Sequence, residues 1–145
     1  MTRIYFDNCC YNRPFDDQTN ILIRLESDAK LHIQELVKSQ KLELVWSFVL
    51  DYENSVNPFA DKRERIQAWR DLAVYHCGFS IQIAEKAKSL ILLGLKKVDA
   101  SHIACAIMSQ ADYFITTDKK VLNKPIADIQ VVNPMTFIER CFNAN

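Results

Sequence analysis

Residues 99–118 read DASHIACAIMSQADYFITTD, a helical segment and a strand that leads to a second aspartate. The run over residues 99–108 is rich in alanine and other apolar residues, and it predicts a helix. Residues 113–116 have the length and composition of a buried strand, and Asp118 follows within two residues. Functional groups in parallel sheets collect at the carboxyl ends of the strands. The stretch therefore predicts an α/β fold with acidic residues gathered at one edge of its sheet.

The same alternation of strands and helices continues along the chain. We expect strands at residues 4–6, 41–46, 113–116 and 129–132, and helices at residues 19–39, 61–75, 81–93, 99–108 and 134–140, together with one that is capped by Ser47 and runs through Glu53. This order predicts a three-layer α/β/α architecture with a central parallel sheet. A chain of 145 residues without repeats or linkers is expected to form a single domain, residues 1–145.

Composition excludes several classes of protein. Lysine plus arginine and aspartate plus glutamate both number 18, so the zero net charge argues against a protein that coats nucleic acid by charge alone. Only two glycines are present, which excludes a P-loop. The five cysteines lack Cys-x-x-Cys spacing, which favours reduced thiols over zinc or disulfides. With no signal peptide and no membrane span, we expect a cytoplasmic protein without membrane association.

Four carboxylates are candidates for one site. Asp7 directly follows the first expected strand and Asp118 follows the third, while Glu53 and Asp99 lie on helices that can reach the same edge. Hard divalent cations prefer carboxylate oxygens. Packed carboxylates without a cation repel one another. The set therefore indicates a site for Mg²⁺ or Mn²⁺.

Each of these residues also has a simpler interpretation. Asp99 is a good helix N-cap and Asp118 suits a turn. Asp51 and Asp112 compete with their neighbours for a place in the site. His102 lies one helical turn from Asp99, and we interpret it as a packed, hydrogen-bonded residue rather than a catalyst. The ordered set of acids outweighs the single alternatives.

Several segments resemble the PIN-domain family in their order and separation. They are Tyr5-Phe6-Asp7-Asn8, Ser47 with Glu53, Asp99-Ala-Ser-His102-Ile-Ala104-Cys-Ala106, Phe114-Ile-Thr-Thr117-Asp118 and Val131-Val132-Asn133-Pro134. The resemblance implies an α/β/α fold, magnesium or manganese in an acidic pocket, and hydrolysis of phosphodiesters, usually of RNA. It implies that Asp7, Glu53, Asp99 and Asp118 are the catalytic acids. Of these, Asp7, Asp99 and Asp118 are expected to bind the metal.

One position departs from the family. Members often carry Ser or Thr and then Asn after the first aspartate, whereas this chain has Asn8 and then Cys9. We expect Asn8 to take the supporting role. The other supporting or substrate-binding residues that we expect are Arg13, Ser47, Lys97, His102, Thr117 and Lys119. Tyr11, Phe15 and Trp69 are candidates to stack bases, although helical spacing favours a core position for Trp69.

Two functions remain open. The resemblance implies a metal-dependent endoribonuclease acting on single-stranded RNA, similar to the toxins of toxin–antitoxin pairs, with an antitoxin partner and a homodimer. The alternative is a catalytically weak module that keeps the fold and binds nucleic acid or protein. The four acids favour the enzyme. The Asn8-Cys9 departure and the zero net charge keep the module open.

Overall fold

The computed structural model describes residues 1–12 and 20–143, and its strands form one five-stranded sheet in which every pairing is parallel. β1 (Arg3–Phe6) is central, between β2 (Glu43–Ser47) and β4 (Tyr113–Ile115). β3 (Tyr75–Cys77) and β5 (Gln130–Val132) are the edges. The strand order β3-β2-β1-β4-β5 reverses direction between β1 and β4, which makes their carboxyl ends the switch point where parallel sheets bind ligands.

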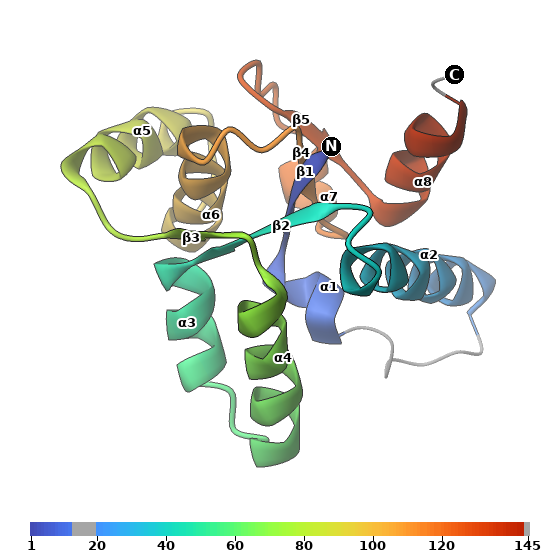
Figure 1. The fold of residues 1–145 in the computed structure, drawn as a ribbon. Helices are drawn as coiled ribbons and strands as arrows, with labels where there is room; N and C mark the ends of the chain where they lie inside the picture. Colours follow the sequence, from blue (N-terminus) through green and yellow to red (C-terminus); the bar gives the residue numbers. More distant parts are fainter. Residues whose placement is uncertain (13–19, 144–145) are drawn as a thin grey trace.

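Helices cover both faces of this sheet (Figure 1). α5 (Ile81–Ile91) packs on α6 (Lys97–Met108) on one face, and α2 (Ile21–Lys38) packs on α8 (Pro134–Asn143) on the other. The remaining helices are α1 (Asn8–Asn12), α3 (Phe48–Ser55), α4 (Ala60–Leu72) and α7 (Lys119–Leu122). The predicted three-layer α/β/α architecture with a central parallel sheet is confirmed.

The central strand is buried on both faces. Ile4, Tyr5 and Phe6 are each at most 2% exposed, as expected where helices cover both sides of a parallel sheet. The Tyr5 ring stacks on Phe114 of the neighbouring β4, with 5.3 Å between the ring centroids. Tyr5 thus spans from the hydrophobic core toward the carboxyl edge, where its hydroxyl becomes part of the candidate site.

One helix prediction was wrong at its end. We expected residues 61–75 to be helical, but α4 ends at Leu72 and residues 75–77 form the edge strand β3. Ala73 is extended, and the Val74 N–H donates to the Leu44 carbonyl at 2.9 Å. Pairing with β2 therefore overrides the helical pattern.

Two short helices, α1 and α7, were not predicted. Each begins beside an acid of the expected set: α1 starts at Asn8, directly after Asp7, and Asp118 is the N-cap of α7. The helix expected to start at Asp99 begins two residues earlier, at Lys97. These corrections change the local setting of the acids without moving them from the sheet edge.

The structure also describes the five cysteines and the character of the helices. All five cysteines are free thiols, with Cys10, Cys77 and Cys105 buried and Cys9 and Cys141 half-buried. Within residues 1–12 and 20–143, no helix combines the length and the apolar character needed to cross a membrane.

Candidate active site at the carboxyl edge of the sheet

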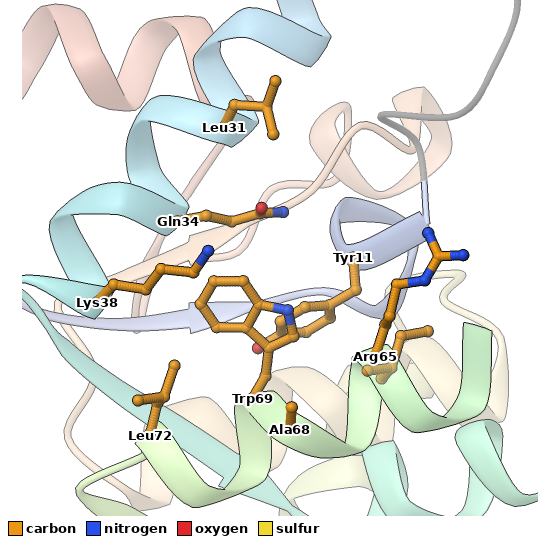
Figure 2. Close-up of a pocket in the computed structure, with 9 residues that line it drawn as sticks. Tyr11, Leu31, Gln34, Lys38, Arg65, Ala68, Trp69 and Leu72 are labelled. Carbon is orange, nitrogen blue, oxygen red and sulfur yellow. The ribbon is translucent and has the colours of Figure 1, made fainter. Parts of the chain in front are cut away.

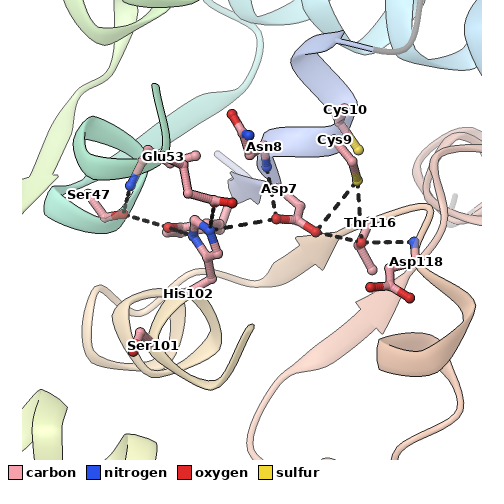
Figure 3. A network of polar contacts seen from close by, with 12 residues as sticks. Asp7, Asn8, Cys9, Cys10, Ser47, Glu53, Ser101, His102, Thr116 and Asp118 are labelled. Carbon is pink, nitrogen blue, oxygen red and sulfur yellow. Dashed lines mark hydrogen bonds and ion pairs between the residues drawn. The ribbon is translucent and has the colours of Figure 1, made fainter. Parts of the chain in front are cut away.

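Asp7 is held rigidly at the switch point. Its backbone N–H continues the β1–β4 ladder by donating to the Ile115 carbonyl at 2.9 Å. The residue is 7% exposed. Its carboxylate accepts hydrogen bonds from the Asn8 N–H at 2.8 Å and the Thr116 hydroxyl at 2.7 Å (Figure 3). Because β1 and β4 both fix this side chain, one oxygen is directed toward α6 and the other toward the β4 end.

His102 connects Asp7 to Glu53. Its ring is 1% exposed, its Nε2 pairs with the Glu53 carboxylate, and the same atom lies 3.9 Å from Asp7 Oδ1. Its Nδ1 shares a 2.5 Å hydrogen bond with the Tyr5 hydroxyl, which in turn bonds the Ser47 hydroxyl at 2.5 Å. Burial lowers the pKa of His102, but the hydrogen bond to Glu53 and the charge of Asp7 outweigh it, so the pKa is raised. The interpretation of His102 as a packed, hydrogen-bonded residue is confirmed, and the bonds orient Glu53.

Asp99 and Asp118 complete the acidic group. Asp99 is half-buried in the first turn of α6, and its pKa is raised by burial and by the charges of Asp7, Asp118 and Glu53, against the opposing effect of His102. Asp118 Oδ1 accepts the Lys120 N–H at 2.9 Å, and the Asp118 N–H donates to the Thr116 hydroxyl that holds Asp7. The structure thus brings all four predicted acids to one edge of the sheet, close enough to perturb one another.

The predicted supporting residues occupy different positions. Ser47 caps α3 by accepting the Leu50 N–H at 3.2 Å, and the Thr117 hydroxyl donates to the Cys9 sulfur at 3.3 Å. Asn8 supports Asp7 through its backbone N–H; its side-chain oxygen is buried and finds no partner among the described residues. Lys97 and Lys119 are exposed, and Arg13 lies outside the described residues.

Three residues of the site were not singled out from the sequence. Thr116 bridges Asp7 and Asp118, Tyr5 holds His102, and the Cys9 thiol lies 3.5 Å from Asp7 Oδ2. For Thr116 the sequence gives one signal, because it begins the polar run Thr116-Thr117-Asp118 that follows a predicted strand. A strand tyrosine carries no such signal, because its hydroxyl could have faced either end of the sheet.

The two rival acids have structural roles. Asp51 accepts a 2.8 Å hydrogen bond from the Trp46 indole and lies 3.3 Å from Arg70 Nε. Asp112 precedes β4 and accepts the Arg3 backbone N–H at 2.8 Å, at the amino end of the sheet. Both carboxylates are satisfied by partners within the fold, so neither competes for the site.

The donor set fits a hard divalent cation. Asp7, Glu53 and His102 each offer an atom within 4.8 Å of the other two. Asp99 and Asp118 add carboxylate oxygens beside this group. Oxygen-rich sets of this kind suit Mg²⁺ and Mn²⁺, and a cation would relieve both causes that raise the pKa of Asp99, its burial first and then the negative charges of the neighbouring acids.

Two hollows flank the acids on either side of α7. The larger, about 640 Å³, is lined by Cys9, Thr117, Asp118 and Lys119 together with residues of α2. The smaller, about 280 Å³, includes Asp99 in its wall. Asp118 and Asp99 thus each line a separate hollow, with α7 between them.

A further hollow of about 310 Å³ lies between α2 and α4 (Figure 2). Trp69 forms part of its wall, and Lys38 Nζ lies 5.3 Å from the Trp69 ring centroid. Trp69 packs against the core as predicted but is only partly buried, whereas Tyr11 is 5% exposed. None of the four acids lines this groove, so it is separate from the candidate site.

Similarity to known proteins is found at the level of structure. No protein-family model matches the sequence, and no curated protein matches it. A chain of the VapBC2 complex of Rickettsia felis, bound to a DNA fragment from its promoter, aligns with a TM-score of 0.56 and 14% identity over 92% of this chain and 98% of that chain. A chain of a toxin–antitoxin complex from Klebsiella pneumoniae aligns with a TM-score of 0.57 and 23% identity over 90% of this chain and 97% of that one. The chain therefore shares its fold, over nearly its whole length, with chains of toxin–antitoxin complexes, in agreement with the PIN-like fold expected from the sequence.

Proposed function

We propose that this protein is a metal-dependent endoribonuclease. The observation that carries the proposal is the convergence of Asp7, Glu53, Asp99 and Asp118 at the switch point of a parallel sheet. Within the described part of the chain, none of these carboxylates forms an ion pair with a lysine or an arginine. Such a group opposes folding unless it serves a cation. The choice of RNA as substrate follows from the resemblance to the PIN-domain family.

In this proposal Asp7, Asp99 and Asp118 hold the ion. When bound there, Mg²⁺ or Mn²⁺ supplies a more acidic water and stabilises the charge that develops on the phosphate. The protein contributes the orientation of the ligands. The Thr116 hydroxyl holds Asp7, while His102, fixed from behind by Tyr5, orients Glu53.

The Asn8-Cys9 departure leaves Asp7 well supported. The Asp7 carboxylate still accepts the Asn8 N–H, the Thr116 hydroxyl and the Cys9 thiol. The departure is therefore compatible with activity, which favours the nuclease over a weak binding module that has only kept the fold.

We also propose that the protein is the toxin of a toxin–antitoxin pair, acts in the cytoplasm, and forms a homodimer. The likeness in fold to chains of two toxin–antitoxin complexes supports the first part. The product of a small neighbouring reading frame is the natural antitoxin candidate, and it would mask the acidic edge.

The test is cleavage of a labelled single-stranded RNA with Mn²⁺ or Mg²⁺. Cleavage that a chelator abolishes and added metal restores is the expected result, because the carboxylates need the ion. The control is the same purified protein with RNA in chelator, which reports binding without cleavage. Binding of RNA with no cleavage in either metal would favour the interaction module instead.

A further inference from the structure

The smaller hollow beside α7 combines a candidate catalytic acid with a group of lysines. Asp99 forms part of its wall, and Lys96, Lys120 and Lys124 line it from the start of α6 and from the segment that contains α7. Lys120 and Lys124 are close neighbours in the chain, and the fold brings Lys96, from the start of α6, to them. The hollow measures about 280 Å³.

The three ammonium groups have no ion-pair partner in the part of the chain that the structure describes. No salt bridge or side-chain hydrogen bond within the described residues involves Lys96, Lys120 or Lys124. By contrast, the half-buried Lys86 does pair with Asp128. A hollow whose wall holds three lysines and one carboxylate, Asp99, carries an excess of positive charge and attracts an anion.

Lys124 is placed by the backbone of a neighbouring loop. Gly94 has a φ of +96°, and a Cβ built on it would lie 2.7 Å from Lys124 Nζ. The ammonium group therefore occupies space that any side chain at position 94 would fill.

We propose that this hollow binds the phosphate of a nucleotide that adjoins the cleaved phosphodiester of single-stranded RNA. The inference rests on the proposed function. Four clustered carboxylates repel a polyanion, so a substrate strand needs positive charge close to them, and a lysine pocket that shares Asp99 supplies it. The residues concerned are Lys96, Lys120 and Lys124, rather than Lys97 and Lys119.

The chemistry of the wall selects phosphate over the other parts of a nucleotide. No aromatic ring is among the described residues that line the hollow, so a base has nothing to stack on. The lysines disfavour a second cation. A phosphate would neutralise the charge of the lysines. α6 carries both Lys96, at its N-cap, and Asp99, in its first turn, so this helix sets the distance between the bound phosphate and the acids.

Binding of a fluorescent 12-nucleotide oligouridylate, measured by anisotropy in chelator over a series of salt concentrations, tests the site. We expect Lys120→Ala/Lys124→Ala to weaken binding and to make the slope of log K against log salt less steep by about 0.7 for each phosphate that the variant no longer neutralises. The matched control is Lys41→Ala/Lys88→Ala, which removes the same charge from two exposed lysines outside the hollow. Equal weakening in the two double variants would overturn the proposal, because charge alone would then explain it.

The same variants separate this proposal from the nuclease assignment. In the cleavage assay we expect Lys120→Ala/Lys124→Ala to raise KM several-fold while kcat stays near that of the wild type. Lys120→Arg/Lys124→Arg should restore KM, and melting curves exclude unfolding as the cause. If the wild type does not cleave but the two double-alanine variants still differ in binding, the nuclease assignment fails and the phosphate site stands. Unchanged binding in a folded Lys120→Ala/Lys124→Ala protein would remove the site, whatever the cleavage assay shows.

Discussion

The two ends of the sheet treat carboxylates in opposite ways. At the amino end, both acids are held by Arg3. The backbone N–H of Arg3 donates to the Asp112 carboxylate at 2.8 Å, and its guanidinium lies 3.7 Å from the Glu43 carboxylate. A second guanidinium nitrogen donates to the Ser109 carbonyl at 2.7 Å. Each charge there has a partner, and the arrangement ties β1 to β2 and to the start of β4.

At the carboxyl end, the acids face one another. Within the described residues His102 is the one cationic side chain that forms an ion pair with any of them, and the pKa of Asp99 is still raised. Protein stability does not require such an arrangement, since acids paired as at the amino end would cost less. The contrast teaches that a carboxylate held singly by partners within the fold is structural, whereas several carboxylates gathered at one edge mark a site for a ligand.

The largest effect that the contrast predicts is on catalysis. Asp99→Ala should lower RNA cleavage by a factor on the order of 10⁴, because effects of that order follow the removal of a residue that acts directly in catalysis. The same substitution should abolish the rise in melting temperature that Mn²⁺ gives the wild type, since a ligand stabilises only the state that binds it. The measurements are initial cleavage rates and melts with and without Mn²⁺.

Asp112→Ala is the control for that experiment. It removes an acid from the amino end and should cost about 1 kcal/mol of stability, because the hydrogen bond from Arg3 is no longer made. Cleavage and the response to Mn²⁺ should remain those of the wild type. If Asp99→Ala and Asp112→Ala respond alike to Mn²⁺, the ion does not bind at the carboxyl end and the four-acid site is wrong.

An intermediate effect is expected at His102. This side chain touches the acids without touching substrate in our proposal, so it is a positioning residue. His102→Gln should reduce cleavage by roughly 10–100-fold and raise the Mn²⁺ concentration needed for half-maximal rate, because His102 Nε2 lies 3.9 Å from Oδ1 of the proposed metal ligand Asp7 and a change behind a ligand typically has effects of this size. Tyr5→Phe, which keeps the stacked ring and removes the hydroxyl, should shift both quantities in the same direction by less. A folded His102→Gln protein with wild-type metal dependence would show that His102 does not support the metal site.

Much of the fold could be predicted from the sequence because its central strands and long helices have strong periodic patterns. The strand before Asp7 and the one before Asp118 were both found where apolar runs end in polar residues. The edge strand β3 was missed because the helical pattern was followed as far as residue 75, and three residues that are extended only by pairing with β2 show no strand period of their own. The short helices α1 and α7 were missed because four or five residues are too few to show a period.

The site was predictable as a set of acids but not as a network. Order along the chain sufficed to name Asp7, Glu53, Asp99 and Asp118. The links between them run through Tyr5, His102 and Thr116, and these depend on which way buried side chains point. Such directions follow from the packing of β1, β4 and α6 together, so they could not be deduced from any one segment.

The smallest predicted effect is on stability, and its sign distinguishes the two ends of the sheet. In metal-free protein, Asp99→Asn should raise the melting temperature at neutral pH, because it removes the burial cost and the repulsion that raise the pKa of Asp99. A carboxyl group whose folded-state pKa is raised binds its proton more tightly in the folded state. Its ionisation therefore destabilises the fold as pH rises above about 4, the ordinary aspartate pKa, and through the raised value. The difference between Asp99→Asn and wild type should be near zero at the acidic end of that range and should grow with pH.

Asp112→Asn gives the matched comparison for the same change of charge. An asparagine at position 112 keeps an oxygen that can accept the Arg3 backbone N–H, and no other acid among the described residues faces this position for the change to relieve repulsion. The variant should therefore have the stability of the wild type or slightly less at every pH. Melts of wild type and both variants from pH 4 to pH 8 in chelator make the comparison, with an excess of Mn²⁺ as a second condition. The bound cation should reverse the order at position 99, making wild type more stable than Asp99→Asn, because the ion binds the carboxylate more tightly than the amide. An Asp99→Asn protein that melts below wild type across the metal-free series would show that Asp99 is satisfied within the fold, as Asp112 is, and the distinction between the two ends would fail.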